Sequence, residues 1–469
     1  MKIFIEKSIK EIQNMLYNNE IDVKDLMYEC INNSRRYSYY KFWNSFDENL
    51  LNERYNELLN PIDILLNPTT LISNVPSNPT YPYAKGNNNL YGIPFGVKDV
   101  FNTIDYTTEM GSVIWKDFYA GNDARVVSKL LYNKGIMAGK TVTAEFAVHS
   151  LNETLNPYDI ERTPGTSSSG SAVATALGIV PFALATQTAG SIIRPASFCG
   201  VYGYKPSFGT IPRTGVLKTT DSLDSIGFLT SNAYNLRYVF DIISVKGLDY
   251  PYQNKAFSDI NRQCCGNRKW KIAFVKTYIW NEAEEYVKER VFEFVNKISK
   301  DDNIELVEID VNSIISGAHD IHEIIYNKSL AYYFENEHND RDRVSKVMTE
   351  MLDKGDSITK LQYIETLEEQ NSMCKKMDEL MCNYDAIISI ATSSVAPFRN
   401  DIEKRDPSLI WTLLHLCSIS VPTFNENGLP FGVQISGRRY NDYLLLELIE
   451  YLANKQYIPN HTNTCFEEK

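Results

Sequence analysis

The first sixty residues of the chain show the spacing of apolar positions that is typical of helices. From residue 3 onward, Ile5, Ile9, Ile12 and Leu16 recur every three or four residues and therefore share one face of a helix. The same spacing predicts a second helix over residues 23–31. We therefore expect residues 1–75 to form an N-terminal helical part.

After Pro61 the composition changes to Asn, Pro and Tyr up to about residue 89, which predicts a surface loop rather than a domain boundary. From residue 91 to 230, short apolar runs alternate with Gly, Ser and Pro. We predict a strand in each of four runs, YGIPFGVKDV, KGIMAGKTV, GIVPFALAT and CGVYGYKPS. Helical segments such as ARVVSKLLYNKG lie between them, and this alternation favours an α/β sheet.

The second half of the chain has a mainly helical part and a final α/β part. Residues 240–380 include a strand-like KIAFVK and continue as amphipathic, charge-rich helix, for example AEEYVKERVFEFVNKISK. Residues 384–455 carry the strand candidates AIISIAT and GVQISG and end in a helix near YLLLELIEYLANK. We predict one continuous domain over residues 1–469, with a sheet completed by both halves of the chain.

The composition and net charge of the chain limit which kinds of molecule it is expected to bind. The chain is 43% hydrophobic, which suffices for a large buried core. Its formal net charge of −12 disfavours binding to the nucleic-acid backbone or to an anionic membrane surface. Small neutral or cationic substrates remain compatible with this charge.

The eight cysteines are scattered and include the adjacent pair Cys264 and Cys265, which suits a reducing compartment better than a disulfide framework. The N-terminal residues mix charges into their apolar positions, unlike a signal peptide. The sequence has no window of 18 uncharged apolar residues that would predict a membrane span. We therefore expect a cytoplasmic protein.

The stretch GTSSSGSAVA, residues 165–174, is unusually rich in serine. A phosphate-binding loop would require GxxxxGK[ST], and the lysine of that motif is missing here. A linker is also disfavoured, because residues 172–180 continue as a small-residue helix. The stretch is better interpreted together with a second small-residue turn, ATQTAGSIIRPASFCG, and with Lys98, which lies among apolar residues and glycines. Burial lowers the pKa of a lysine, and a neutral lysine can activate a serine hydroxyl without a histidine.

These segments resemble the amidase signature family. The run from residue 165 to 209 is similar to the signature sequence of that family, and Lys98 in GVKD resembles its upstream lysine motif. The resemblance covers residues 90–235, with weaker agreement in YDAIISIATSSVAP and in SISVPTFNENGLPFGVQISGRRYND. It implies an α/β fold, in which helices flank a mixed central β-sheet within a single large domain.

The resemblance also implies a catalytic triad. Ser191 would be the nucleophile, Ser167, preceded by a cis peptide bond, the bridging serine, and Lys98 the final base. Neutral Lys98 would take a proton from Ser167, and Ser167 would take one from Ser191 as Ser191 attacks an amide carbonyl. No cofactor and no metal are implied.

The same resemblance assigns supporting roles. The backbone N–H groups of Thr188, Ala189 and Gly190, with that of Ser191, would form the oxyanion hole. The family often has aspartate where this chain has Gln187, and often a shorter spacing before the arginine that corresponds to Arg194. Hydrogen bonds from these two side chains are expected to replace the usual ones. Ser168 is expected either to supply a supporting hydrogen bond or to serve only as a turn residue.

Other reactive side chains give weaker predictions. Cys199 lacks a nearby histidine partner and is expected to be a small core residue. His319 and His322 have helical spacing but no evident third ligand, so we expect a solvated helix face rather than half of a metal site. His149 is a weak candidate for lining a pocket.

Three functions follow as expectations. The first is a stand-alone amide hydrolase that acts on a small-molecule amide, with homodimerisation possible and with neither nucleic acid nor membrane as partner. The second, from the same family, is the glutamine-hydrolysing A subunit of a tRNA-dependent amidotransferase. That subunit usually carries a Lys-Arg-Arg-Ile run, which the corresponding region here lacks. The third is a non-catalytic binding protein that retains the fold, which the intact Lys98, Ser167 and Ser191 disfavour.

Overall fold

The computed structural model describes residues 2–59, 89–245 and 263–462, and its centre is a mixed sheet of eleven strands. The strand order is β1-β3-β2-β4-β6-β5-β10-β11-β9-β7-β8. The strand bounds are β1 Trp43–Phe46, β2 Pro94–Lys98, β3 Ile136–Thr141, β4 Phe182–Gln187, β5 Tyr202–Lys205, β6 Ser225–Thr230, β7 Trp270–Val275, β8 Ile304–Ile309, β9 Ala386–Ile390, β10 Cys417–Glu426 and β11 Leu429–Gly437.

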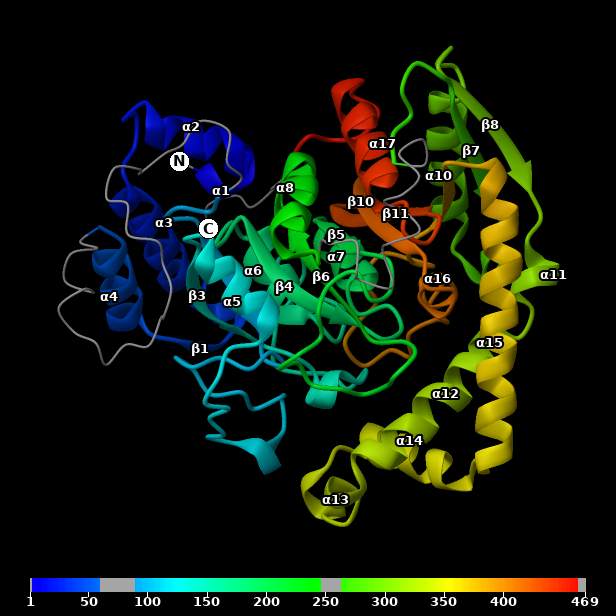
Figure 1. Ribbon diagram of the computed structural model, residues 1–469, viewed down its shortest axis with the longest axis horizontal. Helices are drawn as coiled ribbons and strands as arrows, with labels where there is room; N and C mark the ends of the chain where they lie inside the picture. Colours follow the sequence, from blue (N-terminus) through cyan, green and yellow to red (C-terminus); the bar gives the residue numbers. More distant parts are fainter. Residues whose placement is uncertain (1, 60–88, 246–262, 463–469) are drawn as a thin grey trace.

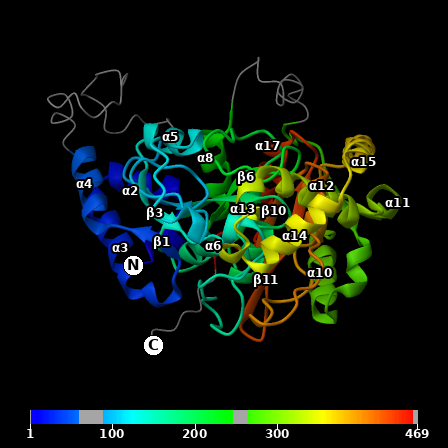
Figure 2. The same cartoon turned by 90° about the horizontal axis from the view of Figure 1, so that it is seen from below.

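Helices flank this sheet, with α1 to α4 gathered at one end of the molecule and α10, α11 and α15 at the other (Figures 1 and 2). Their bounds are α1 Ile3–Glu6, α2 Ile9–Tyr17, α3 Val23–Arg36, α4 Glu48–Leu59, α5 Arg125–Tyr132, α6 Ser169–Ala176, α7 Ile193–Cys199, α8 Ala233–Ile243, α10 Glu285–Ile298, α11 Asn312–Ile315, α12 Ala318–Tyr333, α13 Glu335–His338, α14 Lys346–Ser357, α15 Lys360–Leu380, α16 Leu409–Leu413 and α17 Asp442–Asn454.

Both halves of the chain complete the sheet, which confirms the predicted single α/β domain. Strand β2 pairs in parallel with β3 and β4, whereas β4 pairs antiparallel with β6. The antiparallel pair β10 and β11 lies between β5 of the first half and β9 of the second. All four strands predicted between residues 91 and 230 are present, as are those in KIAFVK, AIISIAT and GVQISG.

The N-terminal part differs from the prediction in three respects. Ser8 starts a new helix, α2, through a capping box with Glu11, so the predicted first helix is divided in two. Helix α3 continues to Arg36, beyond the predicted residue 31. Strand β1 was not predicted, because its four residues are all half-buried and show no alternation of apolar and polar positions. Most of the loop predicted after Pro61 lies outside the described residues.

The sheet brings two chain segments together at the site. Because β2 and β4 are parallel neighbours, their carboxyl ends, at Lys98 and Gln187, lie at the same edge. Helix α6 is buried along its whole length, and its small residues allow a close approach to the sheet. A Cβ atom added at Gly170 would lie 2.4 Å from the backbone nitrogen of Val142, so this position requires glycine.

Candidate active site

Lys98, at the end of β2, is completely buried. Its Nζ lies 2.7 Å from Ser167 Oγ and 2.9 Å from Thr186 Oγ1. Burial lowers the pKa of Lys98 well below its ordinary value of 10.5, and the charge of Asp224 opposes this shift. The neighbouring carboxylate, Asp99, does not pair with Lys98 but with Lys140, at 2.7 Å.

Ser167 follows a cis peptide bond, Thr166–Ser167, as the resemblance to the family implies. The preceding Gly165 has a φ of +85°, and a Cβ atom there would lie 2.8 Å from Pro195 Cα. Ser168 Oγ donates a hydrogen bond to the Thr186 carbonyl at 3.3 Å. Ser168 also occupies the N-cap position of α6, without a side-chain capping bond, so Ser167 is not the cap of that helix.

The turn between β4 and α7 carries Ser191 and is held through three consecutive carbonyl groups. The carbonyl of Thr188 accepts a hydrogen bond from His322 Nε2 at 2.9 Å, and the carbonyl of Ala189 accepts one from Thr412 Oγ1 at 2.6 Å. The carbonyl of Gly190 accepts one from the backbone N–H of Arg194 at 2.9 Å.

The N–H groups of the same turn are available for a ligand. Across the described part of the chain, the N–H groups of Ala189, Gly190 and Ser191 donate no hydrogen bond to a backbone carbonyl. The side chain of Thr188 also holds the start of the turn, because Thr188 Oγ1 donates a hydrogen bond to Asp224 Oδ1 at 2.8 Å. Three such donors close to a serine hydroxyl are the arrangement that stabilises an oxyanion.

Gln187 and Arg194 both hydrogen-bond to backbone around the predicted triad. Gln187 Oε1 accepts the N–H groups of Ile192 and Ile193 at 2.7 and 3.0 Å. Arg194 Nη2 donates to the Thr166 carbonyl at 2.9 Å, at the cis peptide bond that precedes Ser167. Arg194 Nη1 also pairs with Glu403 at 2.9 Å.

The expectation of a solvated face for His319 and His322 is wrong. His322 is 3% exposed, because α12 packs against the turn after β4 as well as against neighbouring helices. His319 is half-buried, and its ring nitrogens contact the Tyr278 hydroxyl at 2.6 Å and the Asp406 carbonyl at 3.1 Å. Over residues 2–59, 89–245 and 263–462, no group of three or more His, Cys, Asp or Glu side chains is placed to hold a metal ion.

Cys199 is fully buried, as predicted, and donates weakly to the Pro164 carbonyl at 3.4 Å. Burial raises the pKa of the Cys199 thiol, which disfavours the thiolate. His149 is exposed. Neither Thr412 nor the contact of His322 with the turn could be predicted from the sequence, because both residues lie more than 130 residues from the turn and neither belongs to a local motif.

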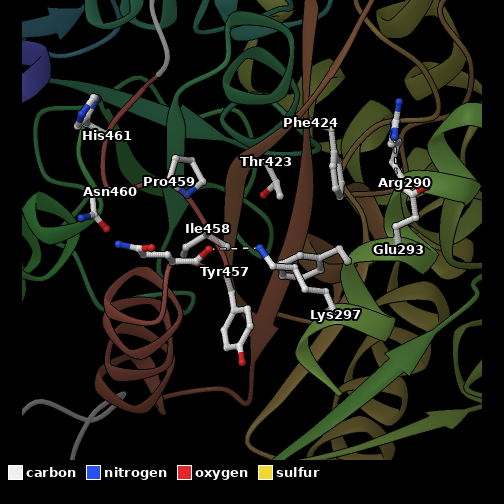
Figure 3. Close-up of a pocket in the computed structure, with 12 residues that line it drawn as sticks. Arg290, Glu293, Lys297, Thr423, Phe424, Tyr457, Ile458, Pro459, Asn460 and His461 are labelled. Carbon is white, nitrogen blue, oxygen red and sulfur yellow. Dashed lines mark hydrogen bonds and ion pairs between the residues drawn. The ribbon is translucent and has the colours of Figure 1, made fainter. Parts of the chain in front are cut away.

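A well-defined pocket lies elsewhere on the molecule. It has a volume of about 540 Å³ and lies between α10, β10 and the segment after α17 (Figure 3). None of the predicted catalytic residues lines it. A much smaller cavity adjoins Thr186 and Thr188, beside the end of β4. No helix in the described ranges is long and apolar enough to cross a membrane.

Known proteins with similar sequences belong to one enzyme family. The model of the Amidase family matches residues 78–446. The chain belongs to the amidase family. The A subunit of the glutamyl-tRNA(Gln) amidotransferase of Macrococcus caseolyticus is 30% identical over 408 residues, which cover 76% of this chain and 82% of that protein. Its counterpart in Chlamydia muridarum is 29% identical over 421 residues, which cover 81% and 85%.

Solved structures show the same fold. A crystal structure described as an amidase superposes with a TM-score of 0.82 at 20% identity, covering 96% of this chain and all of that one. The native peptide amidase from Stenotrophomonas maltophilia has a TM-score of 0.75 at 20% identity, covering 99% and 100%. The glutamyl-tRNA(Gln) amidotransferase A subunit from Thermotoga maritima has a TM-score of 0.75 at 23% identity, covering 98% and 99%. The protein is thus an amide hydrolase with the amidase fold, and it cleaves a carboxylic amide C–N bond.

Proposed function

We propose that this amidase acts through an acyl-serine intermediate on Ser191, with Ser167 as the bridging serine and Lys98 as the final base. The observation that carries the proposal is the 2.7 Å contact between Lys98 Nζ and Ser167 Oγ, because both side chains are completely buried. A lysine in this setting favours its neutral form, which can accept a proton.

The proton and electron movements follow from this arrangement. As Ser191 Oγ bonds to the amide carbon, its proton passes to Ser167 Oγ, and the proton of Ser167 passes to the lone pair of Lys98 Nζ. Collapse of the tetrahedral intermediate breaks the C–N bond, and the leaving nitrogen takes up a proton returned by the same route. Water then attacks the acyl carbon and gives a proton to the relay. The ester C–O bond breaks, the relay returns that proton to Ser191 Oγ, and the carboxylic acid leaves.

The turn after β4 supplies the second element of the mechanism. The N–H groups of Thr188, Ala189, Gly190 and Ser191 are the groups that would bind the developing oxyanion. Losing one such donor typically costs about 3 kcal/mol of transition-state stabilisation. Gln187, Arg194 and Ser168 act as supporting residues through their hydrogen bonds to the surrounding backbone.

The first experiment is intact-protein mass spectrometry after treatment with a fluorophosphonate, which phosphonylates activated serines. Wild-type protein should gain one adduct, and the Ser191→Ala variant should gain none. The same pair of proteins should then differ in hydrolysis of a panel of aryl, aliphatic and amino-acid amides. Full activity of Ser191→Ala would contradict the proposal.

A second candidate is glutamine hydrolysis for a tRNA-dependent amidotransferase, which the names of the curated relatives favour. The missing Lys-Arg-Arg-Ile run weighs against it. A glutaminase assay on the isolated chain, with asparagine and a simple aliphatic amide as alternative substrates, separates the two. A clear preference for glutamine would favour the amidotransferase role, whereas turnover of the other amides alone would favour a stand-alone enzyme.

We further propose a small-molecule amide as the substrate and the variable region, residues 240–380, as a source of specificity. A cytoplasmic location is proposed from the cysteines, since all seven that the structure describes are free thiols. Homodimerisation is possible, and sedimentation of the purified chain would test it.

A further inference from the structure

In the turn after β4, a hydrogen bond to a backbone carbonyl also fixes the direction of the N–H group of the next residue. In a trans peptide unit, the C=O of one residue and the N–H of the next point in opposite directions. The peptide bonds from Thr188 to Ser191 are trans. A donor that holds the Thr188 carbonyl therefore fixes the direction of the Ala189 N–H, and a donor that holds the Ala189 carbonyl fixes that of the Gly190 N–H.

The donor for the Thr188 carbonyl is His322, which comes from α12 in the variable region of the chain. His322 Nε2 lies 2.9 Å from this carbonyl oxygen. A carbonyl can only accept, so Nε2 carries the hydrogen. Burial lowers the pKa of His322 to about 4, so the ring is neutral at pH 7. The contact is thus an uncharged hydrogen bond in a position closed to water.

The donor for the Ala189 carbonyl is Thr412, which comes from α16. Thr412 Oγ1 donates to that carbonyl at 2.6 Å and accepts from Gln187 Nε2 at 2.8 Å. The hydroxyl has a single hydrogen and a second acceptor within reach, the Ser408 carbonyl at 3.3 Å, but the shorter contact directs that hydrogen at the Ala189 carbonyl. Gln187 itself holds the far end of the turn through the N–H groups of Ile192 and Ile193.

We propose that His322 and Thr412 are positioning residues that orient the Ala189 and Gly190 N–H groups of the oxyanion hole. This inference rests on the proposed acyl-serine mechanism. Both residues act through the backbone rather than by touching the substrate. A geometry change in oxyanion donors lowers the rate of the covalent step more than it weakens ground-state binding. His322 thereby links the variable region to the catalytic turn.

The test uses two pairs of variants in the full chain. His322→Leu and Thr412→Val remove the donor at similar volume, whereas His322→Gln and Thr412→Ser keep a donor within reach. Ile325→Ala is the matched control, because Ile325 is fully buried on the same helix but has no polar side-chain atom. Each protein is treated with the fluorophosphonate, and the maximal rate of phosphonylation of Ser191 and the inhibitor concentration at half-maximal rate are determined. Thermal melts establish that each variant is folded at the assay temperature.

We expect His322→Leu and Thr412→Val to lower the maximal rate about 10- to 100-fold with little change in the half-saturating concentration. Thr412→Ser and His322→Gln should recover most of the rate, and Ile325→Ala should react like the wild type. If His322→Leu does not fold, the Thr412 pair decides the question alone.

Two results would overturn the proposal. Equal rates in wild type, His322→Leu and Thr412→Val would show that the anchors do not orient the donors. An equal loss in Ile325→Ala would show a general effect of destabilisation. Wild-type protein that is not phosphonylated at Ser191 would instead contradict the proposed function itself, so the two failures are distinguishable.

Discussion

Lys98 and Asp99 are neighbours in the chain, yet their side chains take different partners. Asp99 pairs with Lys140 at 2.7 Å, whereas Lys98 contacts Ser167 at 2.7 Å. Successive side chains at a strand end point to opposite faces, which separates the two groups. The carboxylate next to Lys98 in the sequence is therefore paired with another cation. Among the residues that the structure describes, none places a carboxylate in direct contact with Lys98, where it would keep the lysine charged.

This arrangement predicts that activity rises with pH. Only the neutral form of Lys98 accepts a proton, and burial lowers its pKa well below 10.5, so the rate should rise as Lys98 loses its proton and level off below pH 10.5. The measurement is kcat/KM for an amide, and the rate of phosphonylation of Ser191, as functions of pH.

The matched control is Lys98→Arg, whose guanidinium keeps its proton throughout the range. This variant should be inactive at every pH, although it is a cation of similar length. Phosphonylation involves no titrating substrate. If the wild-type pH profiles of amide hydrolysis and of phosphonylation agree, the pH dependence belongs to the enzyme. A flat wild-type profile from about pH 6 to 9 would count against Lys98 as the base.

The buried pair of Asp99 and Lys140 predicts a large effect on stability. Both side chains are almost fully buried, and Lys140 Nζ has two further partners, the Thr107 carbonyl and Thr108 Oγ1. Asp99→Asn leaves a buried cation without its counter-charge, which should lower the free energy of unfolding by about 3–5 kcal/mol. Urea denaturation measures the difference.

The pH dependence of that loss provides an internal check. Burial already lowers the pKa of Lys140, and loss of Asp99 lowers it further. The variant should therefore be least stable at low pH, where Lys140 is charged in both the folded and the unfolded protein. It should regain stability as the pH rises from the pKa of Lys140 in the folded protein towards the pKa of Lys140 in the unfolded protein. The double variant Asp99→Asn, Lys140→Met should be more stable than Asp99→Asn near pH 7. The reverse order would contradict this account.

The sequence predicted the local parts of the site better than the distant ones. Lys98 ends strand β2, Ser167 lies just before helix α6, and Ser191 lies in the turn after strand β4, and their motifs are continuous in sequence. His322 and Thr412 reach the turn only through tertiary packing, which leaves no periodic signal. The face of α12 that carries His322 was predicted to be solvated because the sequence does not show which segments cover a helix that has polar residues on several sides.

The hydrogen bonds of Gln187 to the turn that carries Ser191 give a further prediction. Gln187→Leu would leave the buried N–H groups of Ile192 and Ile193 without acceptors, at a cost of about 1–3 kcal/mol each. It would also remove the donor to Thr412. Gln187→Glu keeps an acceptor but lacks that donor. We therefore expect both the melting temperature and kcat to follow the order wild type, Gln187→Glu, Gln187→Leu. Equal values for the two variants would argue against a role for the acceptor.

Gly190 provides the last prediction, because the space beside its Cα is already filled. A Cβ atom there would lie 1.8 Å from Asp406 Oδ2 and 2.4 Å from Ser408 Oγ, so Gly190→Ala must displace either the turn or the carboxylate. A displaced turn misaligns the N–H groups proposed to bind the oxyanion, and kcat should fall about 100-fold or more.

A second substitution tests this cause. Asp406→Ala removes the clashing carboxylate, so the double variant with Gly190→Ala should be more active than the product of the two single effects predicts. Gly428→Ala is the control, because no atom of the described residues lies within 4 Å of its added Cβ atom, although the φ of +84° there disfavours alanine. It should lower stability slightly and leave kcat unaltered. Strict additivity of Gly190→Ala and Asp406→Ala would mean that the clash with this carboxylate does not limit activity, and that the glycine is required for another reason.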